Sequence, residues 1–66
     1  MKYKINIATP VNTKTSKNGI YWEYRGKTEN WKARVERYHY LKEKGWTTAL
    51  GIRVTDENGK VIFEEI

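Results

Sequence analysis

Aromatic rings and cationic side chains are interleaved in one segment of the sequence, YWEYRGKTENWKARVERYHY, from Tyr21 to Tyr40. This segment holds six of the nine aromatic residues and five of the thirteen lysines and arginines. Aromatic rings stack on unpaired bases and cations bind phosphates, so the combination is typical of a nucleic-acid-binding surface. Tyr, Trp and Arg also dominate interfaces between proteins. The segment therefore predicts a binding surface for nucleic acid or for a partner protein.

The expected nucleic-acid-binding surface combines cations and tyrosines of this segment with two lysines from the polar stretch before it. Its predicted members are Arg25, Lys27, Lys32, Arg34, Arg37, Tyr21, Tyr38, Tyr40, Lys14 and Lys17. On a flat sheet such cations reach phosphates, and Arg reaches guanine in the major groove, so DNA is favoured over RNA. Trp22, Trp46 and Phe63 are predicted to lie in the core, because a small core without cysteine needs large side chains.

The net charge of +5 is unevenly distributed along the chain. Residues 1–53 carry twelve lysines and arginines against four glutamates, whereas residues 54–66 carry one lysine against four carboxylates. A basic body attracts polyanions over long distances and releases their counterions on binding. The acidic last segment suits a different role, pairing edge to edge with a partner chain. The alternative function is therefore a small protein-binding inhibitor or accessory protein that acts through an aromatic strip or an exposed edge strand.

The residues that commonly carry catalysis are scarce. The chain has one histidine, His39, one serine, Ser16, and no cysteine. A catalytic Ser–His pair needs a third group to orient it, and the carboxylates are scattered without a spacing suited to acid–base chemistry. A lone histidine without an acidic cluster is also a poor metal site. We therefore predict neither an enzyme nor a metal- or cofactor-binding protein, and no small-molecule substrate.

Four stretches have the two-residue alternation of apolar and polar side chains that is typical of half-buried β-strands. They are Lys2–Ile7, Ile20–Arg25, Trp46–Thr55 and Lys60–Ile66. The segments between them are rich in Gly, Asn, Thr and charged residues, which favour turns and loops. These connections are the loop 8–19, the turn 25–30 and the turn 56–59.

The segment from Trp31 to Lys44 is compatible with two structures. As a strand, it alternates apolar and charged residues along its first half. As a helix, it places four apolar residues on one stripe: Trp31, Val35, Tyr38 and Leu41. The strand is favoured because short connections on both sides suit a meander. We therefore predict a mainly β fold, with one antiparallel sheet or barrel of about five strands. The alternative is an α+β fold with one helix at about 29–44 packed on a four-stranded antiparallel sheet.

The length of the chain predicts a single domain, residues 1–66, because 66 residues barely bury one core. The N-terminal stretch MKYKINIATP alternates charged and apolar residues and lacks the apolar run of a secretory signal. No other segment approaches the length of an apolar membrane span. We expect a cytoplasmic protein that does not associate with a membrane.

Three short motifs occur in an order known from DNA-binding domains. They are GIYW at Gly19, WKARV at Trp31 and LG at Leu50. The order resembles the three-stranded-sheet DNA-binding domains of ethylene-response-type transcription factors and the arm-binding domains of tyrosine integrases, over about residues 19–51. The resemblance implies a sheet in the major groove, with Arg25, Lys32 and Arg34 facing the DNA. The chain departs from both families in its last part, where an expected hairpin takes the place of their C-terminal helix.

Overall fold

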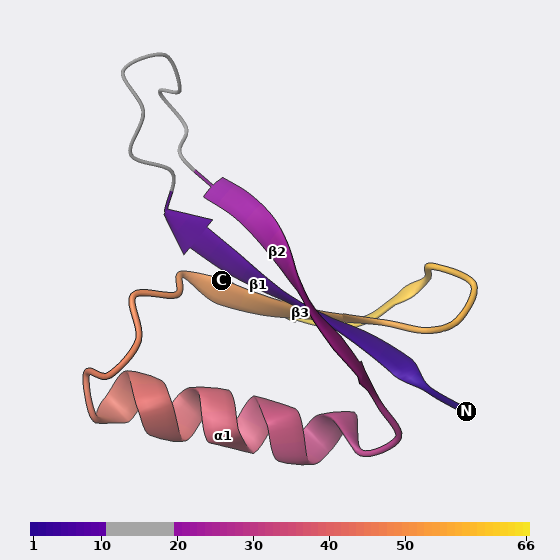
Figure 1. The fold of residues 1–66 in the computed structure, drawn as a ribbon, viewed down its shortest axis with the longest axis horizontal. Coiled ribbons are helices and arrows are strands. Elements are labelled where there is room, and N and C mark those ends of the chain that lie inside the picture. Colours follow the sequence, from indigo (N-terminus) through magenta and orange to yellow (C-terminus); the bar gives the residue numbers. More distant parts are fainter. Residues whose placement is uncertain (11–19) are drawn as a thin grey trace.

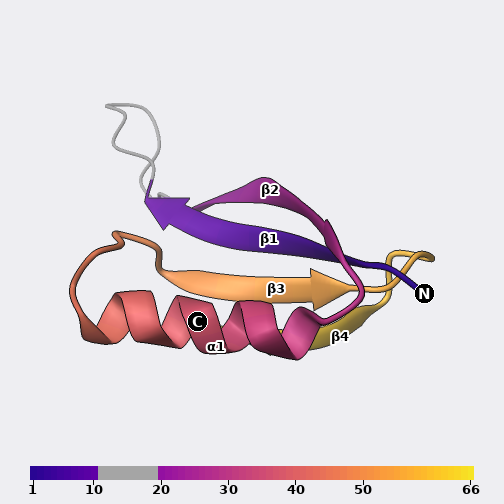
Figure 2. The same ribbon diagram turned by 60° about the horizontal axis from the view of Figure 1, so that its bottom comes forward.

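A four-stranded antiparallel sheet and one helix make up the fold in the computed structural model, which describes residues 1–10 and 20–66. The elements are β1 (Tyr3–Pro10), β2 (Ile20–Thr28), α1 (Trp31–Glu43), β3 (Gly51–Thr55) and β4 (Val61–Glu65). The strand order is β2-β1-β3-β4, so β2 and β4 are the two edges of the sheet. Helix α1 lies on one face of the sheet (Figures 1 and 2). None of the described elements covers the opposite face, which we call the open face.

The α+β alternative is thus the fold that the structure has, and the preferred strand over 31–44 is wrong. Signals at both ends favour the helix. The Oδ1 atom of Asn30 accepts a hydrogen bond from the Ala33 N–H at 3.2 Å, which caps the first turn. At the other end Gly45 adopts a positive φ of 71°. Its N–H donates to Lys42 O at 3.1 Å while the Trp46 N–H donates to Leu41 O at 2.9 Å, a Schellman ending.

Three of the predicted strands are confirmed and one is shorter than predicted. Strand β1 begins one residue after the predicted start, β2 continues to Thr28 rather than turning at Arg25, and β4 lies within the predicted range. The predicted strand Trp46–Thr55 is wrong in its first half, because β3 begins only at Gly51. Residues 44–50, which precede β3, form the end of the helix and the connection back to the sheet.

The core lies between α1 and the inner face of the sheet. Ile5, Ile52 and Val54 supply the sheet side, and Val35 and Tyr38 supply the helix side. Rings at the start of the helix extend this packing. The ring centroid of Trp31 lies 6.5 Å from that of Tyr3 and 5.5 Å from that of Phe63. Together these contacts hold the helix across the two central strands and β4.

The predicted core rings are therefore only partly right. Phe63 packs against the core as expected. Trp22 is half-buried on β2 but lies outside the core cluster, and Trp46 is 68% exposed. The tryptophan that packs against the core is Trp31, which lies on the same side of α1 as Val35.

A β-bulge in β2 decides which face several side chains occupy. Asn6 pairs with Tyr24 and Lys4 pairs with Lys27, so two residues of β2 lie opposite one residue of β1. The second of the two, Gly26, has a φ of 97°, a conformation that favours glycine. Arg25, the residue after Tyr24, lies on the helix side, and the extra residue places Lys27 on the open face with Tyr24.

Candidate nucleic-acid interface

The register of the sheet determines which side chains the open face carries. Ile5 and its partner Val54 point into the core, so the alternate residues of β1 and β3 point the other way. The residues of β2 that pair with the outward-pointing residues of β1 lie on the same face of the sheet. The open face therefore presents Lys4, Asn6, Trp22, Tyr24, Lys27 and Arg53.

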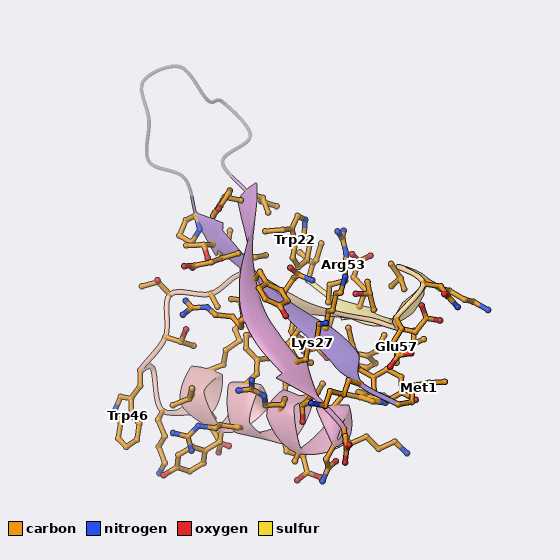
Figure 3. The ribbon with its side chains drawn as sticks, turned by 45° about the vertical axis from the view of Figure 1, so that its right-hand side comes forward. Met1, Trp22, Lys27, Trp46, Arg53 and Glu57 are labelled. Carbon is orange, nitrogen blue, oxygen red and sulfur yellow. The ribbon has the colours of Figure 1, made fainter. Side chains whose placement is uncertain are left out.

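A cation and an aromatic ring are stacked at the centre of this face. The Arg53 guanidinium lies 4.0 Å from the centre of the Trp22 ring, and Figure 3 shows the two side chains together over the sheet. The Arg53 Nε also contacts Glu64 Oε1 at 2.5 Å. The ring and the carboxylate hold the guanidinium plane in place, since its flexible chain is constrained from two sides.

Tyr24 lies beside this stack and is open to solvent. It pairs with Asn6 on β1, and Asn6 pairs with Arg53 on β3, so all three belong to one row across the sheet. The Tyr24 side chain is 53% exposed. An exposed ring in a row with a stacked Arg offers two flat surfaces to a planar ligand.

Two lysines form the next row of the open face. Lys4 and Lys27 are direct cross-strand partners. No carboxylate of the described residues lies within 4 Å of either ammonium group. Like charges directly opposite each other on one face destabilise a sheet, and an anion between them removes that repulsion. We call Lys4, Trp22, Tyr24, Lys27 and Arg53 the open-face strip.

The predicted site residues do not share one surface. Lys27 belongs to the open-face strip, whereas Arg25, Arg34 and Arg37 line a groove on the helix side of the sheet. Lys14 and Lys17 lie outside the described residues.

The other predicted cations and tyrosines are distributed over the helix and the sheet edge. Tyr38 was predicted to lie on the binding surface, and this is wrong: it is 5% exposed and belongs to the core. Lys32 and Tyr40 lie on the exposed part of α1, and Tyr21 is exposed on β2. The resemblance implied that Lys32 and Arg34 lie on a sheet face. The WKARV motif lies on the helix instead, so both residues belong to α1.

Four members of the open-face strip were missed from the sequence: Lys4, Trp22, Tyr24 and Arg53. Their signal was present, because Trp22 and Tyr24 share one side of the alternating segment Ile20–Arg25. Hydrophobicity alone predicts Trp22 in the core. In the structure β2 is an edge strand, and α1 contacts β1 and β3 instead. The register places both rings on the open face, on the side of the sheet away from α1, so they do not reach the core.

A second exposed aromatic pair lies at the end of the helix. Trp46 packs edge to face on Tyr40 with ring centroids 5.9 Å apart, and the Lys44 Nζ lies 5.8 Å from the Tyr40 ring centre. Figure 3 shows Trp46 far from Trp22 and Arg53. This pair is therefore separate from the open-face strip.

Comparisons with protein-family models, with curated proteins and with solved structures found no match. Within the described parts of the chain, α1 is too short and too polar to cross a membrane. The same residues contain no group of three or more His, Asp or Glu side chains arranged to hold a metal ion.

Proposed function

We propose that this chain is a nucleic-acid-binding protein whose open-face strip binds an unpaired strand. The observation that carries the proposal is the arrangement of Tyr24 and the Arg53–Trp22 stack beside two lysines on an uncovered sheet face. Rings supply stacking to bases, and lysines supply contacts to phosphates. The strip has both at once, within three adjacent rows of the sheet.

Each part of the strip has a distinct task in this proposal. One base stacks on Tyr24, and a neighbouring base stacks on the outer plane of the Arg53 guanidinium, which Trp22 supports from below. Lys4 and Lys27 bind phosphates of the same strand. Because every base has a flat face, binding of this kind depends weakly on sequence.

The direct test is Tyr24→Ala, measured by fluorescence anisotropy with a labelled single-stranded oligonucleotide at low salt. Removing one stacking ring is expected to weaken binding by about tenfold, since a stacked base contributes about 1–3 kcal/mol. Tyr21→Ala is the matched control, because Tyr21 lies on the same strand and is similarly exposed at 57% but pairs with Thr9 on the other face.

Two results would contradict the proposal. One is equal loss of affinity in the Tyr24 and Tyr21 variants, which would mean that the open face is not the binding surface. The other is tighter binding of a duplex than of the single strand by the wild-type protein, because stacking on Tyr24 requires unpaired bases.

A partner protein is the second candidate, and the exposure of Trp46 favours it. A tryptophan that is 68% exposed and braced by Tyr40 is typical of a residue that anchors a protein interface. A pull-down from nuclease-treated extract at high salt distinguishes the candidates. A partner that is retained by the wild-type protein and lost with Trp46→Ala supports the protein interface, whereas loss of all partners on nuclease treatment supports nucleic acid.

A further inference from the structure

A groove of about 410 Å³ lies on the helix side of the sheet, away from the open-face strip. Its apolar lining includes Ile5, Ile7 and Leu41, and its cationic lining consists of Arg25, Arg34 and Arg37. The volume lies in the range of pockets that take small organic ligands. The groove therefore combines an apolar surface with three guanidinium groups.

The groove exists because the helix does not cover the whole inner face of the sheet. Helix α1 packs on β1 and β3, which leaves the inner side of β2 uncovered. Arg25 lies beside the bulge at Gly26 and lines this space. The Arg34 Nη2 donates a hydrogen bond to the Arg25 carbonyl oxygen at 3.1 Å, so the helix arginine is anchored at the bulge.

The positive charge of the groove is only partly balanced. Glu23 Oε2 lies 3.0 Å from the Arg25 Nη2. No carboxylate of the described residues lies within 4 Å of Arg34 or Arg37, and residues 11–19 contain no Asp or Glu in their sequence. Two guanidinium groups beside an apolar surface thus carry positive charge that no nearby carboxylate of the described residues balances.

We propose that this groove binds a nucleotide. Arg34 and Arg37 hold the phosphate, because planar guanidinium groups match phosphate oxygens in pairs of hydrogen bonds. The flat base lies against the side chains of Ile7 and Leu41, where its faces are removed from water. A compact anion without an apolar part would leave this surface exposed.

The nucleotide has two possible sources. It is either a free nucleotide or the terminal, 5′-phosphorylated nucleotide of a longer strand, and the second source rests on the proposed function of the open-face strip. Strand β2 is an edge of the sheet, with Tyr24 and Lys27 on one face and Arg25 on the other. A strand bound to the open face reaches the groove by passing over this edge.

The test is a titration of ¹⁵N-labelled protein with a nucleoside 5′-monophosphate, followed by amide chemical shifts. We expect shifts at Ile7, Gly26 and Leu41, and at least tenfold weaker binding of the nucleoside alone and of inorganic phosphate alone. Arg37→Gln should weaken binding of the monophosphate at least fivefold. Arg37 makes no hydrogen bond or ion pair within the described residues, so this change should leave the fold intact.

Lys32→Gln is the control with the same loss of charge. Lys32 lies about 140° around the helix axis from Arg37 and is exposed. We expect the affinity for the monophosphate to stay within twofold of the wild type. Equal weakening by Lys32→Gln would mean general attraction to the charge of the protein and would overturn the proposal.

Two further results would also overturn the proposal: shifts confined to Tyr24 and Lys27, or binding of an acidic peptide in the groove without binding of the nucleotide.

A comparison of an oligonucleotide with and without a 5′-phosphate identifies the source of the nucleotide. If the 5′-phosphate raises the affinity of the oligonucleotide for the wild type and Arg37→Gln abolishes this increase, the ligand is the end of a strand. If the monophosphate binds but the 5′-phosphate does not raise the affinity of the oligonucleotide, the ligand is a free nucleotide. Tyr24→Ala should leave monophosphate binding unchanged, so the two proposals can fail separately.

Discussion

Asn30 and Thr28 determine where the chain leaves the sheet and enters the helix. The Thr28 Oγ1 accepts a hydrogen bond from the Asn30 N–H at 3.1 Å, and the Asn30 Oδ1 accepts one from the Ala33 N–H. These two contacts orient the first turn of α1 and the Trp31 side chain that it carries into the core. At the residue scale, two short polar side chains thus position the helix that lines the groove.

Asn30→Ala removes the cap and is expected to lower the free energy of unfolding by about 1 kcal/mol. Asn30→Ser should restore most of that stability, because a serine hydroxyl can accept the same hydrogen bond. Urea denaturation followed by circular dichroism measures both variants. Equal stability of the alanine variant and the wild type would mean that the first turn does not depend on this cap.

The close approach of β3 and β4 depends on a residue without a side chain. A Cβ atom at Gly51 would overlap the Glu65 carbonyl oxygen and lie 3.1 Å from the Ile66 Cα. Glu64 and Glu65 at the end of β4 contact Arg53 and His39, the latter at 2.7 Å between Nε2 and Oε2. At the scale of elements, Gly51 therefore permits the contacts that attach the last strand to the sheet and to the helix.

Gly51→Ala should displace the end of β4 and lower the free energy of unfolding by about 1–3 kcal/mol, since backbone atoms cannot move aside as a flexible side chain would. We expect amide chemical shifts to change at Glu64 and Glu65. Thr48→Ala, an exposed substitution in the connection just before β3, should change stability by less than about 0.5 kcal/mol. A Gly51 variant as stable as the wild type would contradict this account of the strand packing.

The distribution of charge over the whole molecule produces two basic surfaces instead of one. The open-face strip and the arginine groove lie on opposite sides of the sheet, and edge strand β2 contributes to both. Two carboxylates at the C-terminal end, Glu64 and Glu65, contact Arg53 and His39, so they form contacts within the fold. Six of the thirteen lysines and arginines thus belong to these two surfaces.

Oligonucleotide affinity should decrease as salt rises, because binding releases counterions from the phosphates. In a plot of log affinity against log salt, Lys27→Gln is expected to reduce the slope by about 0.7, the value for one phosphate contact with a single strand. Lys32→Gln should leave the slope nearly unchanged, because Lys32 belongs to neither surface. A slope that is equal in the wild type and the Lys27 variant would remove Lys27 from the interface.

Local sequence patterns were sufficient for part of this structure. The alternation in Lys2–Ile7, Ile20–Arg25 and Lys60–Ile66 predicts three strands correctly, because each pattern reflects contacts on two sides of one extended segment. The basic character of the body also follows directly from composition. Whether Trp31–Lys44 is helix or strand could not be decided in this way, since its apolar residues fit both periodicities.

Tertiary structure alone decided which side of the sheet each ring and cation occupies. Trp22 and Tyr24 face outward because they pair with Ala8 and Asn6 of β1, which alternate with the core residue Ile5 and point away from α1. Arg25 and Lys27 face opposite sides because the bulge at Gly26 inserts one residue into the alternation. Both outcomes depend on contacts between segments distant in sequence, so the composition of Tyr21–Tyr40 indicates binding chemistry without assigning it to a surface.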